Sequence, residues 1–298
     1  VFDIHDPAHP REIAAVDTPG EAHGVAVEGA RVVVAEGAQG GLQVIDASTP
    51  AAAAIVGTYA TSGDANAVAL AGGIAWLADG LPGLRGISLA DPAAPAEVGR
   101  YDSLDAQDVS VFGSIAYLAD GWLGGLAVVS LSDPAHPTRL SGVDTAGRAL
   151  GIAAGEGVVA IIDGPDLGIQ LVDTTTPATP ALSGVIAAPG YAYHVDVQDG
   201  VAYVANGYGG LWTVSVAEPK SPLDLALLDT STESLEELAT RAGFDSPANA
   251  ALGQLDTGAE TLDVRVVGTR AYLADAGAGV RVVSVADPAA PMLLGTSD

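Results

Sequence analysis

Histidine and aspartate side chains stand at four positions where they could bind a metal ion or transfer protons. The positions are His23, Asp108, His194 and Asp263, and each lies at the start of a segment of alternating apolar residues. Imidazole and carboxylate groups bind transition metals and act as general acids and bases. Their spacing is only what a repeated unit of the chain imposes, so a role as ordinary loop residues stays open beside the catalytic one.

A second set of carboxylates ends another apolar segment in successive units, directly or closely before a glycine. Asp and Asn at such positions commonly accept backbone N–H groups and permit a tight turn. A ring of carboxylates would alternatively attract Ca²⁺, which takes about six to eight oxygen ligands, although no Asp-x-Asp-x-Asp-Gly loop occurs. Calcium is therefore the cofactor that this set of residues suggests, and its candidate ligands are Asp79, Asp120, Asp163 and Asp275, with Glu36 and Asn206 at equivalent positions.

Four aromatic residues fall outside the repeated pattern. Trp122 and Tyr208 lie in turns, and Tyr191 and Tyr193 lie in the loop before the fifth complete unit. Exposed aromatic side chains stack on sugars or anchor a protein partner, but they also cover neighbouring loops. These residues are candidate ligand contacts, with the structural alternative left open.

The unit that positions these side chains is about 42 residues long. A proline-containing element marks each unit, and successive first prolines lie 42 or 43 residues apart up to Pro219, after which the step is 69; they are Pro7, Pro50, Pro92, Pro134, Pro177, Pro219 and Pro288. Between the prolines, apolar residues alternate with polar ones in short runs separated by glycine. Such a pattern is typical of short antiparallel strands.

Four strands in about 42 residues form one blade of a β-propeller. Two more strands, near residues 1–4 and 11–17, precede the first complete set. We therefore predict an all-β propeller, a single domain over residues 1–298, with six complete blades and half of a seventh whose inner strands lie outside this range. A six-bladed ring with the N-terminal hairpin on its rim is the alternative. The complete sets begin near Val25, Val68, Val109, Ile152, Val195 and Val264.

The strand order, named A to D outward, gives the loops two faces. The B-to-C turns and the loops from D to the next A share one face, which we call the loop face, and it carries all the candidate ligand contacts. We predict that the 69-residue step from Pro219 to Pro288 contains an insertion at about 230–258, between blades five and six. Ser234 and Glu237 form a capping box there that predicts a short helix on the loop face, acting as a lid, a docking element or a tolerated insertion.

The strand motifs resemble those of the LVIVD-repeat propellers of bacterial and archaeal cell-surface proteins. The resemblance is carried by 42–46 (LQVID), 202–206 (AYVAN) and 271–275 (AYLAD), whereas 159–163 (VAIID) lacks the aromatic residue. It covers nearly the whole chain and implies a propeller fold and an extracellular or cell-surface location. It implies little about function, because one fold hosts many functions.

Composition narrows the classes of function. A net charge of −26 argues against binding nucleic acid or an anionic membrane surface, the absence of cysteine excludes disulfides and thiol chemistry, and no apolar run is long enough to span a membrane. Common hydrolase, metalloprotease and phosphate-loop motifs are missing. We therefore expect a non-catalytic binding, adhesion or scaffolding domain of a larger protein, with a protein or glycan partner. The alternative is a hydrolase or lyase acting on a polysaccharide or small molecule at the channel mouth.

Overall fold

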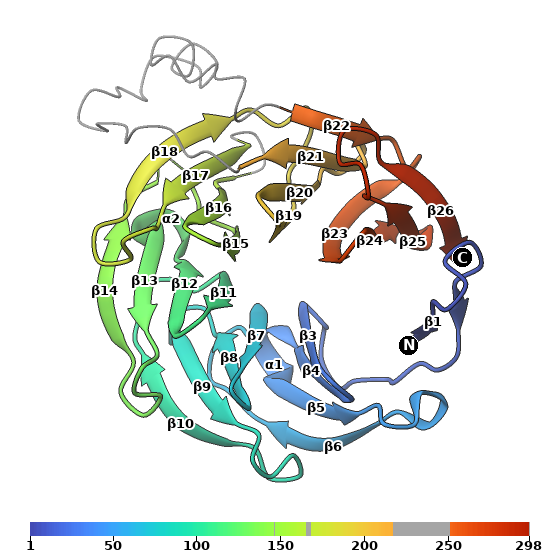
Figure 1. Cartoon of the computed structure of the whole chain (residues 1–298). Helices are drawn as coiled ribbons and strands as arrows, with labels where there is room; N and C mark the ends of the chain where they lie inside the picture. The colour runs from blue at the N-terminus through green and yellow to red at the C-terminus, as the bar shows by residue number, and fades with distance from the viewer. Residues whose placement is uncertain (146, 165–167, 217–250, 298) are drawn as a thin grey trace. The chain divides into compact units, whose positions relative to one another are not determined.

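The computed structural model describes residues 1–145, 147–164, 168–216 and 251–297, which form short antiparallel strands almost throughout (Figure 1). Their alternating apolar pattern and β-branched side chains favour this geometry. None of the described helices is long and apolar enough to cross a membrane. The chain divides into two compact units, residues 1–3 with 12–144 and residues 4–11 with 145–298.

Unit 1 contains three four-stranded antiparallel sheets, which we call blades 1 to 3. Blade 1 consists of β3 (Gly24–Glu28), β4 (Arg31–Ala35), β5 (Leu42–Asp46) and β6 (Ala54–Tyr59). Blade 2 consists of β7 (Ala67–Ala71), β8 (Ile74–Ala78), β9 (Leu84–Ser88) and β10 (Ala96–Tyr101). Blade 3 consists of β11 (Asp108–Phe112), β12 (Ile115–Ala119), β13 (Leu126–Ser130) and β14 (Thr138–Val143). Short helices α1 (Gly37–Gly40), α2 (Gly121–Gly124) and η1 (Pro50–Ala52) occupy turns.

Unit 2 contains blades 4 to 6, which have the same strand order. Blade 4 consists of β15 (Gly151–Gly155), β16 (Val158–Ile162), β17 (Ile169–Asp173) and β18 (Ala181–Ile186). Blade 5 consists of β19 (His194–Gln198), β20 (Val201–Ala205), β21 (Leu211–Ser215) and β22 (Ala251–Leu255). Blade 6 consists of β23 (Glu260–Val267), β24 (Arg270–Ala276), β25 (Gly279–Ser284) and β26 (Met292–Ser297).

Six complete blades are thus confirmed, and each has the predicted A-to-D order. The N-terminal residues form a separate two-stranded sheet of β1 (Phe2–Asp3) and β2 (Arg11–Glu12), the predicted outer half of a further blade. All six blades are four-stranded and antiparallel, so the fold is an all-β propeller.

Apolar side chains of neighbouring blades form the core within each unit. In unit 1, Leu77 of blade 2 packs in one cluster with Val33 of blade 1, and Trp76 packs in another with Val109 of blade 3. Trp76 is almost fully buried. In unit 2 comparable clusters join blade 4 to blade 5 and blade 5 to blade 6.

Every blade has a β-bulge in its outer strand, where the pairing with strand C shifts register. A glycine follows the bulge in most blades, for example Gly57 and Gly99. A Cβ at Gly57 would collide with the carbonyl oxygen of Pro92, and one at Gly99 with that of Pro134. The glycine therefore lets the proline element of the next blade rest against the outer strand of the blade before it.

The insertion lies elsewhere than the sequence suggested. Residues 251–255 form β22, the outer strand of blade 5, so the additional residues interrupt blade 5 between its strands C and D instead of separating blades 5 and 6. Gly253 contacts Pro288 and Ala289 as Gly57 contacts Pro92, which identifies β22 as a regular outer strand. The end of β21 and the start of β22, between which the additional residues fall in the sequence, both lie at the proline-element end of blade 5. The predicted helix, with Ser234 and Glu237, lies outside the described residues.

Candidate functional site

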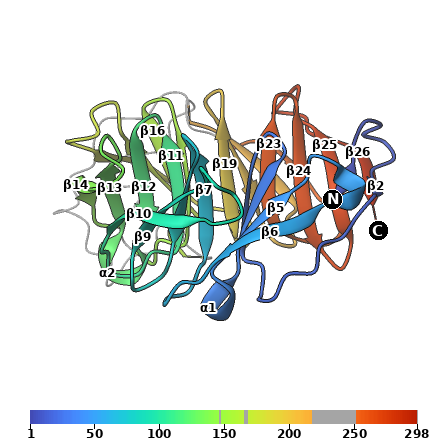
Figure 2. The ribbon, with the colours of Figure 1, turned by 90° about the horizontal axis from the view of Figure 1, so that it is seen from below.

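Hydrogen bonds between neighbouring blades hold the loop face in shape. The glycine that begins a B-to-C turn pairs with a residue just before or at the start of the next strand A, and the pairs are Gly37 with Ala65, Gly80 with Ala106, and Gly207 with Thr261. Their N–H to oxygen distances lie between 2.9 and 3.2 Å. Figure 2 shows α1 and α2, both B-to-C turns, at the same end of the blades in unit 1. Side chains on these loops are therefore presented by a fixed backbone.

In unit 2 the structure brings three of the predicted aromatic contacts together around one turn. Tyr191, Tyr193 and Tyr208 are all exposed, and a Cβ at Gly207 would touch Tyr193 and Tyr191. The Tyr193 hydroxyl donates a hydrogen bond of 2.7 Å to Glu260. That bond raises the pKa of the Tyr193 phenol, with a smaller contribution from partial burial. We call Tyr191, Tyr193 and Tyr208 the tyrosine cluster.

His194 at the start of β19 and Asp263 within β23, the inner strands of blades 5 and 6, form a pair. The distance between His194 Nδ1 and Asp263 Oδ1 is 2.8 Å, and both side chains are partly exposed. Burial alone would raise the pKa of Asp263, but the charge and hydrogen bond of His194 and the N–H of Val264 outweigh it and lower that pKa. An imidazole in close contact with a carboxylate suits proton transfer as well as ligand binding.

In unit 1 the fourth predicted aromatic residue, Trp122, is two-thirds exposed on α2. Leu123 beside it, Leu104 in the preceding loop and Leu81 in the turn of blade 2 are also exposed. Asp120 accepts the Leu104 N–H at 3.0 Å, which fixes this loop against α2. The three leucines were not among the predicted contacts, although an apolar residue in an otherwise polar turn is a signal that the sequence carries. We call Trp122, Leu81, Leu104 and Leu123 the tryptophan patch.

The other two predicted contacts in unit 1 have local roles. His23 lies over Gly37, since a Cβ there would be 3.0 Å from the imidazole, and its Nε2 is 3.9 Å from Glu21. Asp108 is buried and accepts the N–H of Val109 at 2.7 Å. Asp263 accepts the N–H of Val264 in the same way, so this contact is a common start of strand A.

The four candidate calcium ligands are buried and hold loops in place. Asp79 lies 2.7 Å from Arg85 Nε, and burial raises the pKa of Asp79 despite this partner. The other three accept hydrogen bonds as follows: Asp120 from the N–H of Asp105 at 2.7 Å, Asp163 from that of Gly147 at 2.6 Å and from Gln170, and Asp275 from the Thr261 hydroxyl at 2.6 Å and from Arg281. Among the described residues, no group of three or more acidic or histidine side chains is arranged to hold a metal ion. These hydrogen bonds and ion pairs explain why carboxylates end strand B, and calcium binding stays a prediction.

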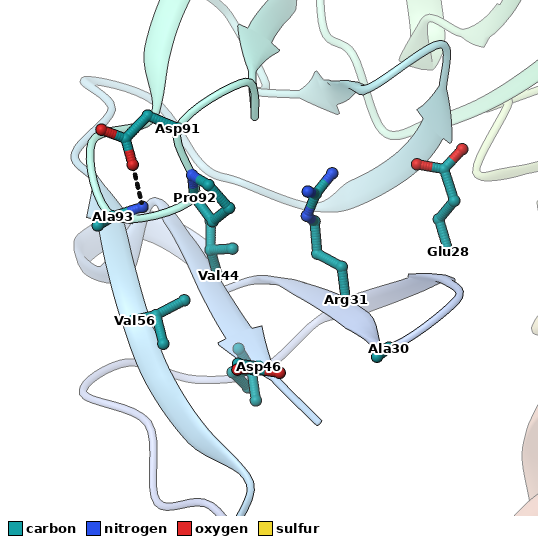
Figure 3. A pocket seen from close by; sticks show the side chains of 10 residues that line it. Glu28, Ala30, Arg31, Val44, Asp46, Val56, Asp91, Pro92 and Ala93 are labelled. Atoms are coloured by element: carbon teal, nitrogen blue, oxygen red, sulfur yellow. Dashed lines mark hydrogen bonds between the residues drawn. The ribbon is translucent and has the colours of Figure 1, made fainter. Parts of the chain in front are cut away.

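A pocket of about 580 Å³ lies at the proline-element end of unit 1. Figure 3 shows Arg31 and Glu28 extending from the turn between β3 and β4, with the Pro92 ring nearby. The Asp91 carboxylate accepts the Ala93 N–H at 3.0 Å, so it stabilises the turn (Figure 3). None of the predicted site residues lines this pocket.

Solved structures share the fold at low sequence identity. A computationally designed protein, Ika8, matches with a TM-score of 0.61 and 10% identity over 91% of this chain and 74% of its own. A protein from Lactobacillus plantarum matches with a TM-score of 0.61 and 14% identity over 86% and 77%. The periplasmic gluconolactonase PpgL of Pseudomonas aeruginosa matches with a TM-score of 0.61 and 14% identity over 74% of each chain. These similarities show the propeller fold alone, and no curated protein matches the sequence.

One repeat family matches the chain in five segments. The LVIVD repeat matches residues 19–61, 62–103, 105–145, 189–227 and 258–298, more than half of the chain. The unmatched part between 145 and 189 holds blade 4, in which Ala160 occupies the place of the strand-B aromatic residue of blades 2, 3, 5 and 6. The chain belongs to the LVIVD-repeat family.

Proposed function

We propose that this propeller is a non-catalytic binding or scaffolding domain, outside the cell or on its surface, that engages a protein or glycan partner through its loop face. One observation carries the proposal. In both units, exposed aromatic and apolar side chains stand on turns of the loop face that hydrogen bonds hold rigid. Exposed apolar clusters of this kind typically mark binding surfaces.

The tyrosine cluster is the part of this surface that we expect to carry most of the affinity. Its backbone is fixed by the bridge between Gly207 and Thr261, and the Tyr193 ring is fixed by its bond to Glu260. A partner therefore orders few side chains on binding, which lowers the entropic cost of association. The neighbouring Glu260 and Asp263 carboxylates offer hydrogen-bond acceptors to sugar hydroxyls or to basic side chains.

A glycan array and a peptide array, each probed with the labelled chain, test the proposal. The double variant Tyr193→Ala/Tyr208→Ala is expected to lose at least about tenfold in affinity for any probe that the unaltered protein binds. Met292→Ala is the matched control, because Met292 is equally exposed but lies on the outer strand of blade 6. Equal binding by the double variant and the control would show that the contact surface lies elsewhere.

The His194–Asp263 pair supports a second candidate, an enzyme with its site at the start of strands A in blades 5 and 6. A carboxylate-oriented imidazole is a common general base, and PpgL is a gluconolactonase with the same fold. Hydrolysis of gluconolactone and of other lactones and glycosides, compared between the unaltered protein and His194→Gln, tests this candidate. Turnover that His194→Gln leaves unchanged, or no turnover of any substrate, would reject it.

A further inference from the structure

Blade 5 carries an amide at the position where the other five blades bury a carboxylate. Asn206 follows β20, and its side chain is fully buried. Among the described residues, neither its Oδ1 nor its Nδ2 has a hydrogen-bond partner. Buried amides are almost always hydrogen-bonded in folded proteins, because an unpaired polar atom costs stability. An amide to which the described fold makes no bond favours a role in binding.

The Asn206 side chain lies between the two loops that carry the tyrosine cluster. A Cβ at Gly190 would lie 3.1 Å from its Nδ2, and one at Gly209 would collide with the same atom. Tyr191 follows Gly190, and Tyr208 precedes Gly209. The unpaired amide is therefore placed at the base of the cluster.

In blade 4 the equivalent carboxylate ties the corresponding loops together. Asp163 accepts the N–H of Gly147, a residue 16 positions earlier, at 2.6 Å. Gly190 precedes Asn206 by the same number of residues, but the Asn206 side chain makes no bond to it. The two loops of blade 5 can therefore separate without breaking a bond to this side chain, and a ligand can reach the amide between them.

The groups around the cluster have acceptors to spare and few free donors. The N–H of Gly207 is bonded to the Thr261 carbonyl at 3.1 Å, and that of Tyr193 to the Ala205 carbonyl at 2.9 Å. The Tyr193 hydroxyl donates to Oε1 of Glu260, which leaves the second oxygen of this carboxylate as an acceptor. A ligand of this site therefore has to donate hydrogen bonds.

The charge of the surrounding loops favours a cation. The loops at 187–193, 206–210 and 256–263 contain three carboxylates and no lysine or arginine. The faces of tyrosine rings attract cations, and a guanidinium group stacks well on them. A guanidinium has N–H donors and no acceptor, whereas hydroxyl groups both donate and accept. The site therefore suits an arginine side chain better than a sugar.

We propose that the tyrosine cluster binds an arginine side chain of a basic protein segment. This inference rests on the proposed function, because it names the partner of the same surface. The guanidinium lies against the rings of Tyr193 and Tyr208 and donates N–H groups to Glu260 and to Oδ1 of Asn206. The rings exclude water from these bonds, which strengthens them.

Fluorescence anisotropy with labelled glycine–serine peptides tests whether the site recognises the charge. One peptide carries arginines, and its control carries citrulline, a neutral residue of nearly the same shape. The arginine peptide is expected to bind at least about tenfold more tightly, and Glu260→Gln is expected to remove most of this difference. Asp199→Asn is the matched control, because Asp199 is an exposed carboxylate in the turn between β19 and β20, at the opposite end of the same blade. Asparagine also tolerates the positive φ of this position.

The role of the amide is tested by comparing affinity with stability. Asn206→Ala is expected to weaken binding of the arginine peptide about fivefold or more, because it removes an acceptor that only the ligand uses. It should lower Tm much less than Asp163→Ala, since Asp163 accepts hydrogen bonds within the fold. An equal loss of Tm in the two variants would show that the amide serves the fold, and would overturn its assignment to the ligand.

The remaining outcomes are equally decisive. Equal binding of the arginine and citrulline peptides shows that the site does not recognise a cation. Equal weakening by Glu260→Gln and Asp199→Asn shows attraction to the overall negative charge and not to this site. If a glycan binds, loses affinity in Tyr193→Ala/Tyr208→Ala and is bound without any binding of the arginine peptide, the proposed function stands and this inference is rejected.

Discussion

Replacing equivalent valines of different blades by alanine should lower the free energy of unfolding by unequal amounts, although the valines occupy the same position of the repeat. Val109 and Val25 occupy the same position in strand A, but Val109 is 5% exposed and Val25 is 59% exposed. Replacing Val109 by alanine removes two buried methyl groups at about 0.8 kcal/mol each and leaves a small cavity, so we expect a loss of about 2 kcal/mol. For Val25→Ala in residues 1–298, the same calculation scaled by burial gives about 0.6 kcal/mol.

Urea unfolding followed by circular dichroism measures both losses in free energy of unfolding. The dependence of that free energy on urea concentration should be the same for the two variants. The difference in strand propensity between valine and alanine is common to both and cancels in the comparison. A loss of stability in Val25→Ala as large as that in Val109→Ala would contradict the exposure of the Val25 side chain. A Val109→Ala variant as stable as the unaltered protein would refute the packing of blade 3 against blade 2.

Three further measurements address the charged groups. Arg85→Met is expected to destabilise the protein by about 3 kcal/mol, because it leaves the buried Asp79 carboxylate unpaired, whereas the exposed Arg100→Met should cost less than about 0.5 kcal/mol. Because His194 lowers the folded-state pKa of Asp263 below its ordinary 3.8, Asp263 contributes stability above that pH and loses it as the pH falls further. Urea titrations of Asp263→Asn and the unaltered protein should therefore converge in acid, and a gap independent of pH would contradict this. At a net charge of −26, raising NaCl from about 20 to about 500 mM should raise Tm, and CaCl₂ at equal ionic strength should raise it further only if the protein binds calcium.

The strand pattern could be predicted from sequence because it depends on local physics repeated many times. Alternation with period two, glycine turns and the proline element recur in each unit, so an error in one unit is corrected by the others. The predicted starts near Val68, Val109 and Ile152 each fall within one residue of an observed strand A. Comparison of the repeats was therefore sufficient to predict the six blades and the order of their strands.

The predicted position of the insertion was wrong because it rested on the spacing of the prolines alone. The outer strand is defined by a contact with the next proline element, which the sequence does not show. The segment 251–255 (ALGQL) carries a glycine after a bulge, as the segment 96–101 (AEVGRY) does. Only the structure shows why that glycine is required, since it lies against the proline element of the next blade. Val25 shows the same limit of the sequence pattern, because it is exposed although the equivalent residues of the other blades are buried.

Comparison of repeated with unrepeated side chains separates folding roles from binding roles. His9 and His136 recur at the same place and pair with Asp6 and Asp133 at 2.8 and 2.9 Å in highly exposed turns, which is a structural contact made twice. The buried carboxylates of the turns likewise recur in five of the six blades, and Asn206 takes their place in blade 5. A side chain that recurs at one position of several blades is best explained by the shared fold, whereas one that occurs in a single blade is the better candidate for binding. Because the tyrosine cluster and the tryptophan patch consist of unrepeated side chains that remain exposed, binding specificity is best sought where the sequence departs from its own repeat.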